Sequence, residues 1–261
     1  GYVDLEDYAR GKGYDLYQQC ATGKYKPDDI MTILEKAGLR GLGGAGFPAA
    51  TKWKFVRAEK GPRYLVVNAD EGEPGTFKDR HYLESDPHRF LEGALIAAWA
   101  VQADDIYIYL RDEYPHIKKI LEKEIDRLRK RNLTRPTFHL RRGAGAYICG
   151  EESALLESLE GKRGLPRHKP PFPAQKGLFG KPTLIHNVET LYWIRDLVEK
   201  GPELFTISGL NDRTGLRSFS VSGHVMEPGV KLAPAGISVQ ELIDEHCGGM
   251  AEGHKFRASL P

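Results

Sequence analysis

Apolar and polar positions alternate along most of the chain in patterns typical of strands and helices in turn. The apolar run at residues 64–67, the segment DDIYIYLRDEY and the stretch 137–143 predict three strands. Between them, residues 85–102 and 115–131 show the apolar spacing of helices. This alternating order indicates a parallel sheet with right-handed crossovers. We therefore expect an α/β fold for the main part of the chain.

The flanking segments suggest smaller elements. A short helix is expected at residues 5–13, and a further helix begins near residue 28 and ends at Gly38. Asn187 is a plausible cap for a helix that continues to about residue 200. From near Leu216 the order strand, Pro-Gly turn, strand, helix predicts a small α+β unit, and we expect the chain to be truncated within it.

Composition and charge narrow the classes of function. The chain has 261 residues and a net charge of +2, which gives no electrostatic reason to expect nucleic-acid binding. No apolar run reaches the roughly 18 residues of a membrane span and no signal peptide is visible, so we expect a cytoplasmic protein without direct membrane insertion. Cys20, Cys149 and Cys247 are too scattered for a metal site within this chain.

The stretch GLRGLGGAGFPAATKWKF at residues 38–55 is the most concentrated candidate for binding chemistry. Gly41, Gly43 and Gly46 match G-x-G-x-x-G, but a helix precedes them where a dinucleotide fingerprint would have a strand. Exposed main-chain amides with Lys52 nearby favour a nucleotide or flavin loop. An ordinary flexible loop is the alternative.

Two other clusters follow predicted strands. Asn68, Asp70 and Glu73 come after the first strand, where ligands of open α/β sheets bind, although a solvated acidic turn has the same composition. A glycine turn and a helix start at Gly150, Glu151 and Glu152 follow the third strand. Such a helix N-terminus attracts anions, but its two carboxylates compete with a bound phosphate. The alternative is that these carboxylates only stabilise the start of the helix. The Pro/Gly-rich loop that follows, with Lys169 and Phe172, is long enough to be functional.

Four blocks together resemble one known family: residues 38–55, NADEGEPGTFKDR, GAGAYICGEESALLESLEG and KPPFPAQKGLFGKPTLIHNVETL. This is the family of FMN- and NADH-binding subunits shared by respiratory complex I, NAD-reducing hydrogenases and NAD-dependent formate dehydrogenases. The resemblance covers residues 30–261. The variants GLRGLGGAGFP and GLPRHKPPFPAQ look most like the beta subunit of the soluble molybdenum-dependent formate dehydrogenase.

The resemblance implies a domain plan. Residues 1–29 would be an N-terminal segment, 30–205 a Rossmann-like FMN/NADH domain, and 216–261 an incomplete ubiquitin-like SLBB domain. The family's helical domain with a 4Fe-4S cluster would lie outside this chain, so no metal ligand is expected here. The implied partners are a small thioredoxin-like 2Fe-2S gamma subunit and a catalytic molybdenum/iron–sulfur alpha subunit.

The resemblance also implies roles for single residues. FMN would be bound by Gly41, Gly43, Gly44, Lys52, Asn68, Asp70, Glu73, Gly150, Glu151, Glu152, His186, Asn187 and Thr190. NADH would be bound by Phe47, Phe55, Glu73, Glu152, Lys169 and Phe172, with the aromatic rings stacking on adenine. Glu73 and Glu152 would orient the ligands and set the local charge, while FMN performs the redox chemistry. The family often has Arg in place of Leu42 and Asn in place of His186, so a phosphate contact is missing and a His186 side-chain contact is less certain.

The expected activity is therefore that of a diaphorase subunit, which exchanges hydride between NAD(H) and FMN and passes electrons to iron–sulfur clusters. Formate dehydrogenase is the expected complex, and complex I and the NAD-reducing hydrogenase are the alternatives. A nucleotide-binding regulatory module without redox chemistry, and a scaffold that has lost its ligands, are the non-enzymatic readings.

Overall fold

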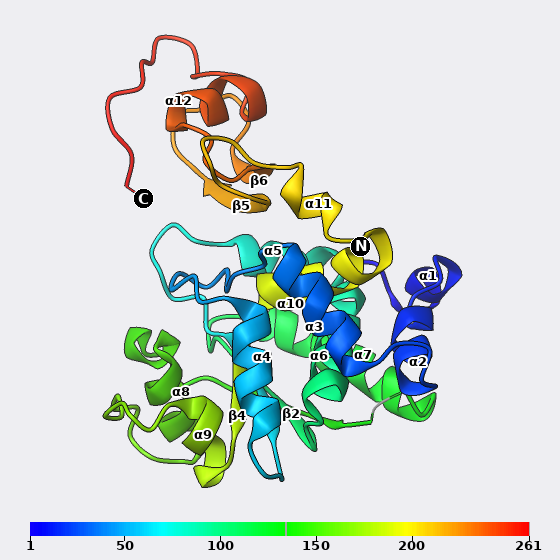
Figure 1. Ribbon diagram of the computed structural model, residues 1–261. Helices are drawn as coiled ribbons and strands as arrows, with labels where there is room; N and C mark the ends of the chain where they lie inside the picture. The colour runs from blue at the N-terminus through cyan, green and yellow to red at the C-terminus, as the bar shows by residue number, and fades with distance from the viewer. Residues whose placement is uncertain (134, 261) are drawn as a thin grey trace.

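The computed structural model describes residues 1–133 and 135–260. Its main sheet has four parallel strands in the order β3-β2-β1-β4 (Figure 1). These strands are β1 (Tyr64–Ala69), β2 (Asp105–Leu110), β3 (Thr137–Arg142) and β4 (Thr183–Asn187). The three predicted strands and their parallel arrangement are confirmed. Strand β4 was not predicted, because all five of its residues are buried and its sequence lacks the alternation of a half-exposed strand.

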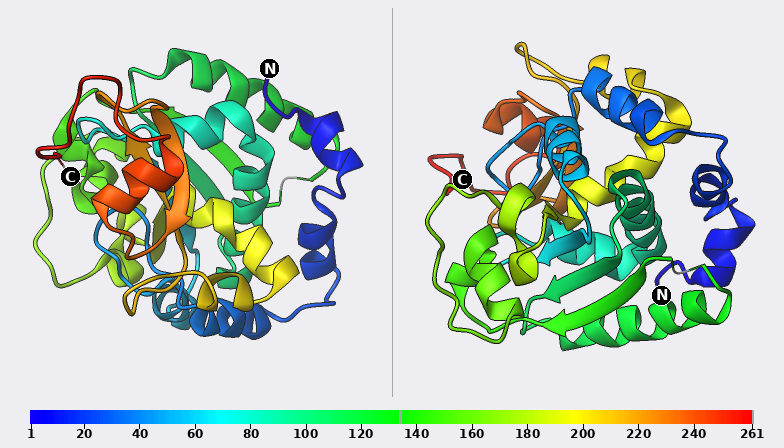
Figure 2. Two further views of the ribbon diagram at one scale, coloured as in Figure 1. Left: turned by 90° about the horizontal axis from the view of Figure 1, so that it is seen from above. Right: turned by 60° about the horizontal axis from the view of Figure 1, so that its bottom comes forward.

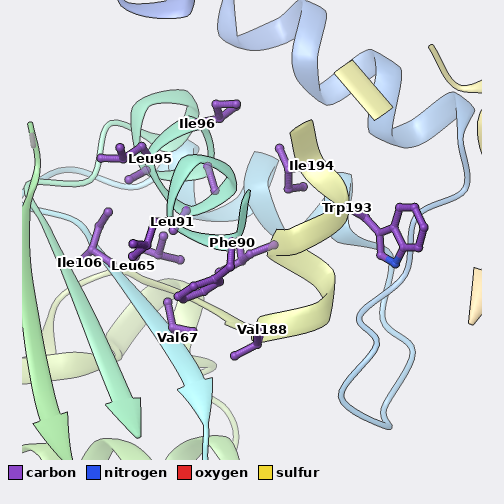
Figure 3. Close-up of a cluster of buried hydrophobic side chains, with 14 of the residues drawn as sticks. Leu65, Val67, Phe90, Leu91, Leu95, Ile96, Ile106, Val188, Trp193 and Ile194 are labelled. Carbon is purple, nitrogen blue, oxygen red and sulfur yellow. The ribbon is translucent and has the colours of Figure 1, made fainter. Parts of the chain in front are cut away.

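One face of the sheet carries the large hydrophobic core. Figure 3 shows Leu65 and Val67 of β1 facing Phe90 and Leu91 of the central helix α6. In α6, a Cβ added at Gly93 would lie 1.9 Å from the main-chain oxygen of Leu191, so this glycine lets α6 and α10 pack closely. The helices on this face are α3 (Pro27–Lys36), α4 (Ala49–Ala58), α6 (Pro87–Val101), α7 (Pro115–Lys130) and α10 (Val188–Lys200).

A smaller core covers the opposite face of the sheet. Val66 and Tyr109 pack there against Cys149, Leu155 and Leu178. The elements that supply the last three residues are η1 (Tyr147–Gly150), α8 (Glu152–Leu159) and η2 (Leu178–Gly180). Helix α9 (Pro173–Lys176) precedes η2, and its Ala174 packs against the large core. Cys149 is a buried free thiol within this core, as the apolar run around it predicts.

The N-terminal segment joins the large core rather than standing apart. Helix α1 (Leu5–Arg10) packs against α6 and α7, and α2 (Asp15–Ala21), which was not predicted, packs against α6. Figure 2 shows both helices, in dark blue, along one side of the molecule. The contact includes buried polar groups, since the Tyr8 hydroxyl donates to Glu92 at 2.6 Å and the Tyr14 hydroxyl lies 2.7 Å from His88 Nδ1.

The C-terminal unit has its own antiparallel pair, β5 (Leu216–Val221) and β6 (Gly229–Pro234). The short helices α12 (Val239–Glu241) and η3 (Leu242–His246) follow, which confirms the predicted order of elements. Helix α11 (Glu203–Thr206) leads to this unit, and α5 (Lys78–Ser85) lies against it. None of the helices in the described residues combines the length and apolar character that a membrane crossing needs.

Candidate functional site

A cavity of about 530 Å³ opens at the carboxyl end of the parallel sheet. Five segments that are far apart in the sequence form its wall: the glycine loop, the end of β1 with its following turn, the start of α5, the η1 region, and the β4–α10 junction. This is the edge at which open α/β sheets bind ligands. The lining residues are Leu42, Gly43, Gly44, Asn68, Asp70, Glu71, Gly72, Glu73, Thr76, Lys78, Asp79, Tyr147, Ile148, Gly150, Glu151 and Asn187.

The glycine loop follows helix α3, as predicted, and leads into helix α4, which was not predicted. The Leu42 amide donates to the Thr190 hydroxyl at 2.8 Å, which fixes the loop to the start of α10. A Cβ added at Gly43 would lie 3.1 Å from the Cβ of Asn187, and Gly44 has a φ of +116°. Both positions therefore favour glycine, one for close approach and the other for its backbone conformation. Asn187 accepts a hydrogen bond from the Thr190 amide at 3.2 Å, which confirms it as the cap of α10.

The end of β1 places a buried carboxyl group in the cavity wall. The Asn68 side chain donates to the Gly150 carbonyl at 2.9 Å and accepts from the Asp70 amide at 3.1 Å. Asp70 is 9% exposed, and its Oδ2 has no hydrogen-bond partner among the described residues. Burial raises the pKa of Asp70 to about 6, with a smaller contribution from Glu113. A ligand hydroxyl would supply the donor that this oxygen lacks.

Beyond Asp70, two exposed groups lie across from each other in the cavity. The Tyr147 hydroxyl donates to Glu73 Oε2 at 2.5 Å. This hydrogen bond joins the turn after β1 to η1. Because both groups are exposed, the hydroxyl or the carboxylate can form a hydrogen bond with a ligand instead.

Two carboxylates at the start of α8 lie next to two lysines, Lys52 of α4 and Lys169 of the loop before α9. Glu151 accepts from the Ser153 and Ala154 amides, both at 2.9 Å, so it caps the helix. Lys169 Nζ lies 2.9 Å from Glu151 and 2.8 Å from Glu152. Lys52 Nζ lies 3.8 Å from Glu152 and donates to the Ile185 carbonyl at 3.1 Å, while burial lowers its pKa.

Three aromatic rings predicted to bind the nicotinamide nucleotide lie outside the cavity lining. Phe47 of the glycine loop is 44% exposed, Phe55 of α4 is 55% exposed, and Phe172 at the start of α9 is 54% exposed. Helix α9 packs against α4, so Phe55 and Phe172 come from neighbouring elements. Exposed rings of this size are suited to contact with a ligand ring.

Five of the predicted FMN residues do not line the cavity, and they are Gly41, Lys52, Glu152, His186 and Thr190. Among them, His186 turns its side chain into the core. Its Nε2 accepts a hydrogen bond from Trp53 Nε1 at 2.8 Å, and burial lowers its pKa well below the ordinary value. The side chains of successive strand residues point to opposite faces, so Asn187 faces the cavity and His186 faces α4. Any contact of His186 with a ligand would have to use its main chain.

The structure adds residues that sequence reasoning missed. Lys78 and Asp79 line the cavity at the start of α5, and Tyr147 lines it from η1. The prediction stopped at Glu73 because α5 is short and strongly polar and was not recognised as a helix. The signal in the sequence for these two residues of α5 is the run GTFKDR, in which a turn is followed by neighbouring residues of opposite charge.

Comparison with known proteins identifies the family. The sequence pattern of the Nuo51 FMN-binding domain (Complex1_51K) matches residues 34–196. An NADH-quinone oxidoreductase subunit of Rhizobium meliloti (strain 1021) is 45% identical over 267 residues, which cover 98% of this chain and 63% of that protein. The mitochondrial NADH dehydrogenase [ubiquinone] flavoprotein 1 of Dictyostelium discoideum is 44% identical over 257 residues, which cover 94% of this chain and 53% of that protein.

A solved structure shares the fold as well. The crystal structure of an NAD+-reducing NiFe-hydrogenase in the air-oxidized state matches with a TM-score of 0.81 and 45% identity, over 87% of this chain and 39% of that chain. The present chain spans less than two thirds of the length of each of these three relatives. The extent of the match and its level of identity establish that this chain belongs to the family of Nuo51 FMN-binding domains.

Proposed function

We propose that this chain is the module of an electron-transfer complex in which NAD(H) and FMN exchange hydride. The observation that carries the proposal is the convergence of the glycine loop, the end of β1, the η1–α8 turn and the β4–α10 junction on one cavity. Their residues are the ones that resemble the flavin site of the family. The names of the relatives, which are an NADH-quinone oxidoreductase and an NAD+-reducing hydrogenase, support the same class of reaction.

The residues of the cavity fit FMN. Gly43 lies against Asn187, the cap of α10, and Gly44 lines the same cavity, so the helix dipole would favour a phosphate there. The unpartnered oxygen of Asp70 suits a hydroxyl of the ribityl chain. FMN, when bound, supplies hydride exchange with NAD(H) and single-electron exchange with iron–sulfur clusters. The protein's own contribution is to bind and orient the two ligands and to set the charge around them.

The nicotinamide nucleotide would lie on the outer side of the cavity. We infer that Phe47, Phe55 and Phe172 offer their exposed rings to the adenine and that Lys169 binds a phosphate. Lys169 already forms ion pairs with Glu151 and Glu152, so a bound phosphate would replace one of these two carboxylates as its partner. Glu152 would then be free to accept a hydrogen bond from a ligand, and Glu73 would accept one in place of the Tyr147 hydroxyl.

The test is reduction of protein-bound FMN by NADH. The purified protein should carry flavin absorbance, and anaerobic addition of NADH should bleach it. Lys52→Met should weaken FMN binding, because it removes a cation beside Glu152. Lys54→Met, on the same helix but paired with the exposed Glu35, is the matched control and should bind FMN like the wild type. A protein that binds neither FMN nor NADH would refute the proposal.

For the parent complex we propose an NAD-dependent formate dehydrogenase, in which electrons reach FMN through iron–sulfur clusters. The support is the pair of sequence variants GLRGLGGAGFP and GLPRHKPPFPAQ. The partners would be a 2Fe-2S gamma subunit and a molybdenum-containing alpha subunit, with a 4Fe-4S cluster outside this chain. Complex I and the NAD-reducing hydrogenase are favoured instead by the relatives' names. Copurification of a molybdenum subunit with formate-dependent NAD⁺ reduction would support the formate enzyme, and copurification of NiFe or quinone-reducing subunits would refute it.

A further inference from the structure

The cavity contains an unbalanced set of charges. Five carboxylate side chains line it, and Lys78 is the only lysine or arginine among its described lining residues. The carboxylates are those of Asp70, Glu71, Glu73, Asp79 and Glu151. A ligand that carries a phosphate and gains electrons would therefore meet mostly negative charge. Lys78 is the one group in the lining that can offset it.

Lys78 is held in place by two carboxylates. Its side chain is 14% exposed, and its Nζ lies 2.9 Å from Asp79 and 2.8 Å from Glu189. Burial lowers the pKa of this ammonium, but the two carboxylates outweigh burial and raise the pKa overall, so Lys78 is charged at neutral pH. Asp79 also accepts from the Glu189 amide at 3.2 Å and from the Asn187 side chain at 3.4 Å. The lysine is thus tied to the junction that faces Gly43.

The C-terminal unit completes this arrangement. The Ser218 amide of β5 donates to Glu189 at 3.1 Å, and the Phe77 amide donates to the Ser220 hydroxyl at 2.9 Å. The Tyr82 and Ser218 hydroxyls lie 2.5 Å apart. Strand β5 therefore holds both the residue before Lys78 and the carboxylate that binds Lys78.

We infer that Lys78 is a positioning residue of the flavin site, which offsets the cofactor's negative charge and is held in place by β5 through Glu189. This inference rests on the proposed function. Loss of the cation should weaken FMN binding and should lower the FMN midpoint potential, because reduction adds electrons in a more negative environment. Loss of the Glu189 charge should raise the potential, because Lys78 is then less neutralised.

The experiment uses the intact protein reconstituted with FMN. The dissociation constant is measured by flavin fluorescence and the midpoint potential by anaerobic spectroelectrochemistry. Lys78→Met should raise the dissociation constant by about tenfold, the effect of roughly one charge-assisted contact, and should lower the potential. Lys78→Arg should restore both. Glu189→Gln, which keeps an acceptor for the Ser218 amide, should shift the potential in the opposite direction.

Lys200→Met is the matched control. Lys200 is exposed at the last position of α10 and pairs with Asp196 at 3.1 Å, so its loss should leave both quantities unchanged. The inference would be overturned if Lys78→Met had the dissociation constant and midpoint potential of the wild type, or if Glu189→Gln had a lowered midpoint potential. If Lys78→Met fails to fold, the other two variants decide. The inference is supported if Lys78→Arg has the wild-type midpoint potential and Glu189→Gln has a raised one. Any other result overturns it. A wild-type protein that binds no FMN would instead refute the proposed function and this inference with it.

Discussion

At the scale of single residues, the cavity contains two features that cost stability. Asp70 keeps a buried oxygen without a partner among the described residues, and Gly44 has a backbone conformation that few residues adopt. An unsatisfied buried acceptor costs roughly 1–3 kcal/mol. Such costs are typical of sites that a ligand completes. At Asp70, stability and ligand binding should therefore respond in opposite directions to substitution.

Gly43→Ala should reduce FMN affinity by about tenfold with a stability loss of only about 1 kcal/mol. The added methyl group would lie 3.1 Å from the Cβ of Asn187, so it would displace the residue that caps α10. Fluorescence titration with FMN measures the affinity and thermal unfolding measures the stability. Gly11→Ala is the control, because Gly11 follows α1, does not line the cavity, and has the Tyr8 oxygen 3.5 Å away as the nearest atom to its added Cβ. Equal affinities in the two variants would contradict the packing argument.

Asp70→Asn should stabilise the ligand-free protein at neutral pH and weaken FMN binding. The folded pKa of about 6 exceeds the ordinary value for Asp, so the folded state holds a proton that the unfolded state has released between about pH 4 and 6. This contribution to stability is therefore full below about pH 4 and is lost as the pH rises through 6.

The free energy of unfolding of Asp70→Asn should exceed that of the wild type by about 1–2 kcal/mol at pH 8 and should equal it near pH 4. Urea unfolding across this range measures the difference. Asp126→Asn removes an exposed carboxylate on α7 and serves as the control for loss of charge alone. A gain for Asp70→Asn that does not depend on pH would contradict the assignment to Asp70.

Sequence reasoning selected eight of the sixteen residues that line the cavity, but it could not predict the directions of their side chains. Glycines, a strand-end carboxylate and a helix cap are visible as residue types in a pattern. The orientation of His186 depends on β4, a strand that the sequence did not reveal, and on Trp53 across the core. Lys78 was missed for a similar reason, since its role depends on Glu189, 111 positions further along the chain.

At the scale of elements, long and strongly periodic segments were predictable and short ones were not. Helices α6 and α7 have 15 and 16 residues, and the three predicted strands show either an apolar run or an alternation of apolar and polar residues. Helices α2, α5 and α9 and strand β4 have between four and eight residues, too few for a periodic pattern to be distinctive. Packing against α6 and α7, rather than local preference, stabilises the N-terminal helices α1 and α2.

The packing of α1 can be tested through its buried hydrogen bond. Tyr8→Phe removes the hydroxyl that donates to the fully buried Glu92 at 2.6 Å, so it should lower the free energy of unfolding by about 1–3 kcal/mol. FMN affinity should not change, because this contact lies outside the residues that line the cavity. Tyr25→Phe, at a partly exposed position before α3, should be nearly neutral. A large loss of FMN affinity in Tyr8→Phe would show that α1 contributes to the site.

At the scale of the whole molecule, two sheets of different construction meet near the cavity. The parallel sheet provides the edge where the cavity opens, and the β5–β6 pair lies against α5, one of the elements of its wall (Figure 1). Sequence order predicted both units. It could not predict their contact, because that contact uses main-chain amides and two serines, which have no distinctive pattern.

A substitution in the C-terminal unit should therefore change the behaviour of the start of α5. Ser220→Ala removes the acceptor for the Phe77 amide, so hydrogen exchange at Phe77 should become faster by about tenfold, in proportion to one lost hydrogen bond. Since Lys78 is the next residue, FMN affinity should fall by a smaller factor. Ser208→Ala, whose hydroxyl donates only to the Leu204 carbonyl at 2.8 Å, is the matched control and should leave exchange at Phe77 unchanged. Unaltered exchange at Phe77 in Ser220→Ala would mean that β5 does not hold the start of α5 in solution, and the C-terminal unit would then have no route to the cavity through this residue.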